Sequence, residues 1–292
     1  MPRTEIEIVT RTVNEVGECP VWHMQEKALY WIDARSPKVF RIDSAGDAKS
    51  WSLPAPAGSF VFRSTGELIV AVKGCFAAVD LDRGTFVPIA DLDADSVETK
   101  PNDGRCDRLG RYWCGTSDRG QAEPVGSLYC LDGDLSCRRM DTGIVAANCG
   151  AFSPDDRTMY YGDSRSDIVW AYDFDLADGV INNKRVFIST RHMPGRVDGA
   201  AVDAEGNYWG AMVHGGRIGC WNARGALVRT VDLPVRHPTM CCFGGEKLDV
   251  LYVTTASAML LPDEGQDQPL AGCVLAVHGL GCVGQPAAFF AG

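Results

Sequence analysis

The stretch DRLGRYWCGTS, residues 107–117, holds a turn rich in Asp and Gly, and an apolar run that starts at Tyr112 follows this turn. The same arrangement returns in DAEGNYWGAMV, residues 203–213, where the matching aromatic residue is Tyr208. A polar turn that leads into a short aromatic run is typical of a β-hairpin. Two well-separated copies of one hairpin motif indicate an internal repeat.

Four further copies extend this repeat over the chain. They are MQEKALYWIDA from Met24, RSTGELIVAVK from Arg63, PDDRTMYYGDS from Pro154 and GEKLDVLYVTT from Gly245. Aligning Tyr30, Leu68, Tyr112, Tyr160, Tyr208 and Leu251 gives steps of 38, 44, 48, 48 and 43 residues. Each repeat also carries a second turn and strand, and no helix-length amphipathic segment intervenes. This pattern predicts an all-β fold, a six-bladed β-propeller that forms a single domain over residues 1–292.

A β-sandwich is the alternative all-β fold, but a sandwich gives no reason for six copies of one motif. The two chain ends carry apolar strands, at Glu5 to Val13 and at Gly272 to His278. We expect these strands to complete one shared blade, because joining the ends closes a ring of blades without an exposed edge.

The composition argues against some classes of binding partner. The 292 residues carry a formal net charge of -10 with acidic residues spread along the chain, which argues against nucleic-acid binding. No secretory h-region and no bilayer-length apolar stretch is found, so we expect a cytoplasmic protein without a membrane partner. The twelve cysteines are scattered, and most of them are expected to be reduced and buried. In the adjacent pair Cys241–Cys242 the two side chains should point to opposite faces of a strand, which disfavours a redox role.

Two segments match known ligand-binding motifs in sequence but lack the structural context that those motifs require. Residues 279–284 read GLGCVG, the dinucleotide fingerprint, but too few residues follow for the helix that this site requires. Asp91, Asp93 and Asp95 resemble the start of a calcium loop, but Ser96 and Asn102 stand where that loop needs Gly and Glu. No serine-hydrolase elbow and no HExxH motif occurs, which leaves oxygen ligands as the plausible chemistry.

Polar residues interrupt the repeat at similar places, about 8 to 14 residues before the repeat tyrosines. The segments are GECP at 17–20, KPNDG at 100–104, ANCG at 147–150 and VDG at 197–199. Equivalent positions in successive blades would gather Glu18, Asn102, Asp103, Asn148 and Asp198 at one mouth of the channel. Carboxylates beside amide oxygens form a hard site that suits Ca²⁺, Mg²⁺, Mn²⁺ or another divalent ion.

These segments resemble the senescence-marker-protein/gluconolactonase family, which includes regucalcin. The resemblance covers GECPVW (17–22), KPNDGRCDRLGRYWCGT (100–116), Asn148 with FSPD (152–155), and the stretch 194–209. It implies a six-bladed propeller with one divalent ion, which could be Ca, Zn, Mn, Mg or Fe. It also implies that Glu18, Asn148 and Asp198 bind this ion, and that Asn102 contacts the substrate.

Two positions depart from the family pattern. Lys100 stands where the family often has Arg, so a point charge replaces a planar fork in contact with substrate hydroxyls. The segment after Thr116 lacks the family's acidic stretch, so no acidic substrate contact is assigned to Gln121. Asp103 is expected either to bind substrate or to support a neighbouring ligand.

The resemblance implies hydrolysis of a sugar lactone to its aldonic acid, with an arabinono-, xylono-, galactono- or gluconolactone as the small-molecule substrate. Asp198 is the candidate to orient or deprotonate the attacking water, while Lys100 and Asn102 would hold ring hydroxyls. Two alternatives stay open: a metal-binding regulatory protein without catalysis, and a metal-dependent aryl-ester or phosphotriester hydrolase. We expect a monomer or a weak homo-oligomer.

Overall fold

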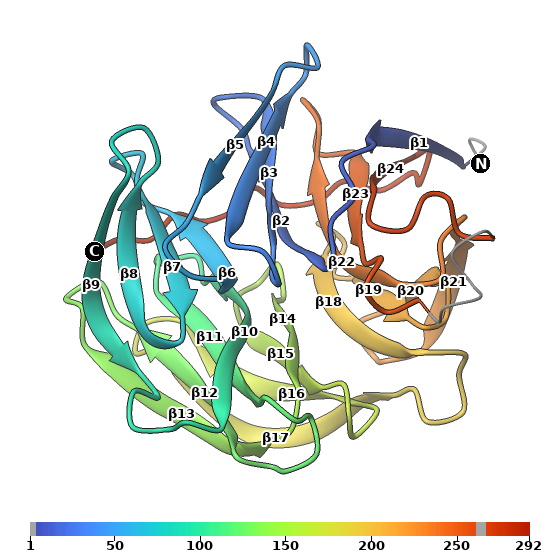
Figure 1. The fold of residues 1–292 in the computed structure, drawn as a ribbon. Coiled ribbons are helices and arrows are strands. Elements are labelled where there is room, and N and C mark those ends of the chain that lie inside the picture. Colours follow the sequence, from blue (N-terminus) through green and yellow to red (C-terminus); the bar gives the residue numbers. More distant parts are fainter. Residues whose placement is uncertain (1–3, 261–266) are drawn as a thin grey trace. The chain divides into compact units, whose positions relative to one another are not determined.

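The computed structural model describes residues 4–260 and 267–292. Over these residues the chain forms twenty-four strands in six four-stranded sheets (Figure 1). The six aligned repeat residues, Tyr30 to Leu251, each lie in the second strand of a sheet and are buried. The repeat therefore predicted the sheets correctly. In this described part, no helix is long and apolar enough to cross a bilayer.

The chain divides into two compact units, which hold three sheets each. Unit 1 comprises residues 1–52 and 188–286. Its first sheet is β2 (Gly17–His23), β3 (Ala28–Asp33), β4 (Lys38–Asp43) and β5 (Ala48–Ser52). The second is β18 (Arg196–Val202), β19 (Tyr208–Val213), β20 (Arg217–Trp221) and β21 (Leu227–Asp232). The third is β22 (Pro238–Gly244), β23 (Val250–Thr255), β24 (Val274–His278) and β1 (Glu5–Thr10).

Unit 2 comprises residues 53–187 and 287–292. Its first sheet is β6 (Ala57–Phe62), β7 (Leu68–Val72), β8 (Gly74–Asp80) and β9 (Thr85–Leu92). The second is β10 (Thr99–Cys106), β11 (Tyr112–Asp118), β12 (Gly126–Leu131) and β13 (Cys137–Ile144). The third is β14 (Ala147–Phe152), β15 (Thr158–Asp163), β16 (Ile168–Asp175) and β17 (Val180–Ser189).

The predicted pairing of the chain ends is confirmed. β1 pairs antiparallel with β24, with Ile6 opposite Val277, and this sheet takes one strand from the N-terminus and three from the C-terminal part (Figure 1). Apolar side chains of second and third strands fill the cores between neighbouring sheets, such as Tyr112 and Phe76 in unit 2. All twelve cysteines are free. Cys241 packs into one core cluster and Cys242 against another, as the strand alternation predicts.

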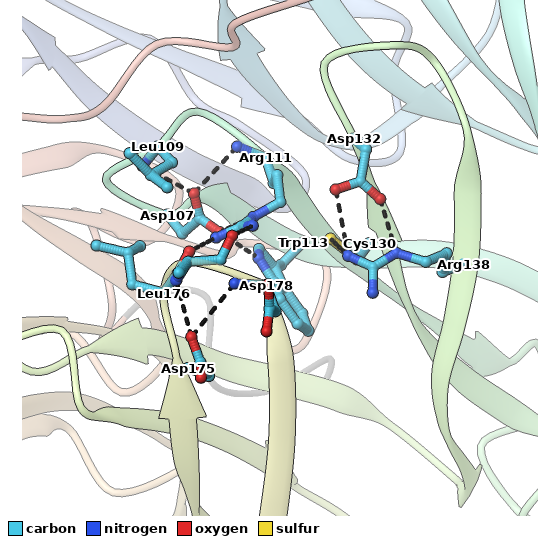
Figure 2. A network of polar contacts seen from close by, with 11 residues as sticks. Asp107, Leu109, Arg111, Trp113, Cys130, Asp132, Arg138, Asp175, Leu176 and Asp178 are labelled. Atoms are coloured by element: carbon cyan, nitrogen blue, oxygen red, sulfur yellow. Dashed lines mark hydrogen bonds and ion pairs between the residues drawn. The ribbon is translucent and has the colours of Figure 1, made fainter.

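Buried carboxylates stabilise the turns between first and second strands. Asp107 accepts hydrogen bonds from Trp113 Nε1 at 3.0 Å and from Arg111 Nε at 2.7 Å (Figure 2). The Arg111 guanidinium also donates to the carbonyls of Leu176 and Ala177, which joins the β10–β13 sheet to the β16–β17 turn. In unit 1, Asp203 accepts from Trp209 Nε1 at 2.9 Å. The repeated Asp and Trp of the opening motif are therefore a structural pair.

The C-terminal segment docks on these turns in both units. In unit 1, Gly284 forms an isolated bridge with Asp203, and a Cβ on Gly284 would lie 2.0 Å from Phe243 Cβ. In unit 2, Phe290 is 1% exposed and its amide donates to Phe62 O at 2.6 Å. The GLGCVG letters are thus part of a packing segment that no helix follows within the described residues 279–292.

Candidate metal and lactone site

The predicted site residues share one backbone feature. The first strand of each of the six sheets carries an irregularity in register, and in four of them it falls at the predicted segments, at Glu18–Val21, Pro101–Gly104, Asn148–Ala151 and Val197–Ala200. In each case the first strand has one residue more than the strand opposite, which is a β-bulge. Bulges bend a strand and re-aim its side chains, and they are frequent beside active sites. The polar segments that interrupt the sequence repeat are therefore the bulges.

The bulges place the residues at two adjacent positions. Glu18 and Asn148 are the last paired residues before their bulges, opposite Ile32 and Gly162. Asn102 and Asp198 instead follow the last paired residue. The residues after Glu18 and Asn148 are both cysteines with positive φ, 48° at Cys19 and 69° at Cys149. The sequence-based expectation of equivalent positions therefore holds to within one residue.

In unit 1, β2 and β18 both pack against β22. Thr239 Oγ1 donates to Gly17 O at 2.5 Å, next to Glu18. On the other side, a Cβ on Gly199 would lie 2.2 Å from Met240 Cγ, so only glycine fits next to Asp198. Glu18 is half-buried, and Asp198 is 7% exposed. Unit 1 thus holds two carboxylates on strands that both pack against β22.

In unit 2, Asn102 and Asn148 are hydrogen-bonded to each other. Asn102 Nδ2 donates to Asn148 Oδ1 at 2.7 Å and to Ala147 O at 2.7 Å. Asn148 Nδ2 donates to Ser164 Oγ at 2.9 Å. These contacts fix both ends of the Asn148 amide. Its Oδ1 accepts one hydrogen bond and keeps a lone pair that can coordinate a cation, and Asn102 Oδ1 stays available as an acceptor.

Asp103 lies in the interior of unit 2. It is 5% exposed, and its Oδ2 accepts the amide of Gly150 at 3.0 Å, in the bulge that follows Asn148. Burial raises the pKa of Asp103, and the neighbouring Arg105 and the amides of Gly150, Gly104 and Cys149 oppose this effect. Lys100, in contrast, is exposed on the same strand, two residues before Asn102.

Sequence reasoning missed the residues that anchor the chain just before the strands that carry Glu18 and Asn148. Asp33 accepts the amides of Glu15 and Val16 at 2.8 and 3.2 Å, just before Glu18. Asp163 accepts the amides of Val145 and Ala146 at 3.1 and 3.0 Å, just before Asn148. The signal was present, because YWID and YYGD place an Asp three residues after the repeat tyrosine in these two repeats.

The rejected calcium loop has a structural role for one of its carboxylates. Asp93 accepts the hydroxyl of Thr116 at 3.0 Å and that of Tyr129 at 2.9 Å. Among the described residues no group of three or more His, Cys, Asp or Glu side chains is suited to a metal ion. The predicted ligand set is of a different kind, because it combines carboxylates with an amide oxygen.

Comparison with known proteins supplies the family. Residues 16–257 match the family model described as SMP-30/Gluconolactonase/LRE-like region. The chain belongs to the SMP-30/gluconolactonase/LRE family. It is 33% identical over 275 residues to a 6-deoxy-6-sulfogluconolactonase of Pseudomonas putida, with 94% of each chain covered. It is 35% identical over 299 residues to the regucalcin of Gallus gallus, with both chains fully covered at 100%.

Solved structures confirm the fold expected for this family. A calcium-binding regucalcin of Agrobacterium tumefaciens superposes with a TM-score of 0.93 at 23% identity, over 97% of this chain and 96% of the other. The predicted all-β six-bladed β-propeller is therefore correct. Each of the six four-stranded sheets is one blade, and the candidate site residues lie on the first strands of four blades.

Proposed function

We propose that this member of the family hydrolyses a sugar lactone to the aldonic acid, with one divalent ion held by Glu18, Asn148 and Asp198. The observation that carries the proposal is the place of these residues: each lies at the bulge of a first strand, and in unit 2 the Asn148 amide is fixed with its oxygen able to coordinate. Two carboxylates and an amide oxygen suit a hard divalent ion. The regucalcin relative described as calcium-binding supports this chemistry.

The chain's own residues account for binding and proton transfer. When bound, a divalent ion supplies positive charge that polarises a lactone carbonyl and acidifies water. Asp198 orients the attacking water and accepts its proton. Asn102 Oδ1 accepts a hydrogen bond from a sugar hydroxyl, since both Asn102 Nδ2 contacts are made within the protein. Lys100, exposed on β10, donates to a second hydroxyl or to an anionic substituent.

The substrate is a pentono- or hexonolactone. A hexonolactone with a negative substituent deserves inclusion in any test, because one relative is a 6-deoxy-6-sulfogluconolactonase. Chelator-treated protein is assayed by acid release on glucono-, galactono-, arabinono-, xylono- and 6-deoxy-6-sulfogluconolactone. Each assay is run without metal and with Ca²⁺, Mg²⁺, Mn²⁺, Zn²⁺ or Fe²⁺. Metal-dependent release from one or two lactones is the expected result.

A variant pair tests the assigned roles. Asp198→Asn is expected to lower kcat about 10²- to 10⁴-fold with an unchanged circular dichroism spectrum, because the amide cannot accept the water proton. Glu246→Gln is the control, because this carboxylate is 71% exposed and pairs with Lys27. Near-normal turnover of Asp198→Asn would contradict the assignment.

The second candidate function is a metal-binding protein without catalysis, which the regucalcin relatives bring into consideration. Tight binding of Ca²⁺ with no acid release from any lactone would favour it. Including phenyl acetate and paraoxon in the panel covers the aryl-ester and phosphotriester alternatives. Faster metal-dependent turnover of either compound than of every lactone would refute the lactonase proposal.

A further inference from the structure

We propose that Asp103 is a positioning residue, whose carboxylate holds the β14 bulge in shape and thereby fixes where Asn148 presents its amide oxygen. The inference deepens the proposed function and rests on it, because it takes Asn148 to be a metal ligand. It also chooses between the two roles that the sequence leaves open for Asp103.

The β14 bulge interrupts the regular register with β15. Asn148 pairs with Gly162 and Ala151 with Tyr160, so Cys149 and Gly150 together lie opposite the single residue Tyr161. Cys149 has a φ of 69°, a left-handed conformation that is unfavourable for a residue with a Cβ. An adjacent residue in such a conformation displaces Asn148 unless the surrounding contacts fix it.

Asp103 supplies those contacts from the neighbouring blade. Its Oδ2 accepts the Gly150 amide at 3.0 Å, and the amide of Cys149 faces the same carboxyl. A Cβ on Gly150 would lie 3.6 Å from Oδ2, which shows how closely the carboxyl approaches the bulge. A carboxylate that accepts successive backbone amides is among the stronger hydrogen-bonding arrangements.

The residue next to Asp103 acts on the same target. Asn102 Nδ2 donates to the Asn148 side-chain oxygen, while Asp103 binds the backbone just after Asn148. Two consecutive residues of β10 therefore hold neighbouring points of β14, the side chain of Asn148 and the backbone of Gly150.

The burial of Asp103 argues against direct contact with the substrate. The residue is 5% exposed, and its Oδ1 is buried without a hydrogen-bond partner among the described residues. Its surroundings are interior groups such as Tyr161, which is 2% exposed and whose pKa burial raises. Lys100 and Asn102 are the more exposed groups on this strand.

The test uses Mn²⁺ alone as the probe, followed by electron paramagnetic resonance of the free ion. Asp103→Ala is expected to raise the Mn²⁺ Kd about 10- to 100-fold, the usual effect of removing a residue that orients a ligand. Hydrogen exchange of peptide 147–152 in metal-free protein should become faster. Asp103→Asn keeps an acceptor for the Gly150 amide, so its Kd should stay within about threefold of the wild type. Asp103→Leu also removes the acceptor while keeping the site filled. If Asp103→Ala does not fold, Asp103→Leu is measured in its place and should show the same rise in Mn²⁺ Kd.

Asp107→Asn is the matched control, because Asp107 is also buried but lies in the turn that directly follows β10. It should lower stability without changing the Mn²⁺ Kd. Unchanged Mn²⁺ affinity and unchanged exchange in both Asp103→Ala and Asp103→Leu would overturn the inference. A raised KM for the lactone with normal Mn²⁺ affinity would also overturn it, in favour of substrate contact.

The two proposals can fail separately. If the wild type binds Mn²⁺ but hydrolyses no lactone, the lactonase proposal fails, and the Mn²⁺ and exchange measurements still decide the role of Asp103. If the wild type binds no divalent ion, Asn148 is not a ligand and the inference falls with it. That outcome is visible in the wild type, without any variant.

Discussion

Replacing Arg111 by Met removes a guanidinium from a buried ion pair. The Arg111 side chain is 9% exposed and that of Asp107 is 0% exposed, and their Nε–Oδ2 distance is 2.7 Å (Figure 2). The variant leaves the Asp107 carboxylate buried without its cation and two carbonyls, of Leu176 and Ala177, without their donor. Breaking a buried pair by removing one partner costs about 3–5 kcal/mol of unfolding free energy.

The assay is urea unfolding followed by circular dichroism, with Arg108→Met as the control. Arg108 pairs with Asp156, but its side chain is 50% exposed, so its loss should cost less than about 1 kcal/mol. In the double variant Arg111→Met/Asp107→Asn the uncompensated charge is removed, so the total loss should be smaller than the sum of the single losses. A loss for Arg111→Met no larger than that for Arg108→Met would refute the reasoning.

Three further predictions follow from other features. Phe290→Ala should lower the unfolding free energy by about 3–5 kcal/mol in the same urea assay, because Phe290 is buried. Phe289→Ala is the control and should cost clearly less, because Phe289 is only half-buried. Equal effects of the two variants would contradict the docking of the C-terminus. Burial raises the pKa of Cys130 to about 12, so at pH 8 only about one thiol in 10⁴ is a thiolate. Iodoacetamide should therefore label Cys130 only after unfolding, as followed by peptide mass spectrometry. Rapid labelling of the native protein would contradict this prediction. Ca²⁺ at about 100 times its Kd should stabilise the protein by about 2.7 kcal/mol in thermal melts, and an unchanged Tm would argue against a site in the native state.

The fold was readable from the sequence because each blade repeats the same local solution. An Asp-bearing turn and a buried strand recur at Tyr112 and Tyr208, and the structure shows why: the turn carboxylates Asp107 and Asp203 bind the tryptophans that follow those tyrosines. The pairing of the chain ends followed from the same logic. A repeat of this kind is local, and local patterns can be recognised in a single sequence.

The details of the site were less accessible. The spacing to the repeat tyrosine differs between segments, since Glu18 lies 12 residues before Tyr30 and Asp198 only 10 before Tyr208. The bulges bring these residues to within one register position of each other, and a bulge is a property of how two strands pair. The hydrogen bond between Asn102 and Asn148 joins different blades, so no local sequence pattern predicts it.

The pairing of β1 with β24 has a consequence during protein synthesis. The partner of β1 is made roughly 260 residues later, which at about 5–20 residues per second leaves the N-terminal strand without its neighbour for roughly 13–50 s. A free strand edge over such a time can pair with other nascent chains. Glu5 and Glu7, both exposed on β1, place negative charge on this strand and oppose such pairing. The last blade to be completed is thus also the one that contains β1, the earliest of the described strands to leave the ribosome.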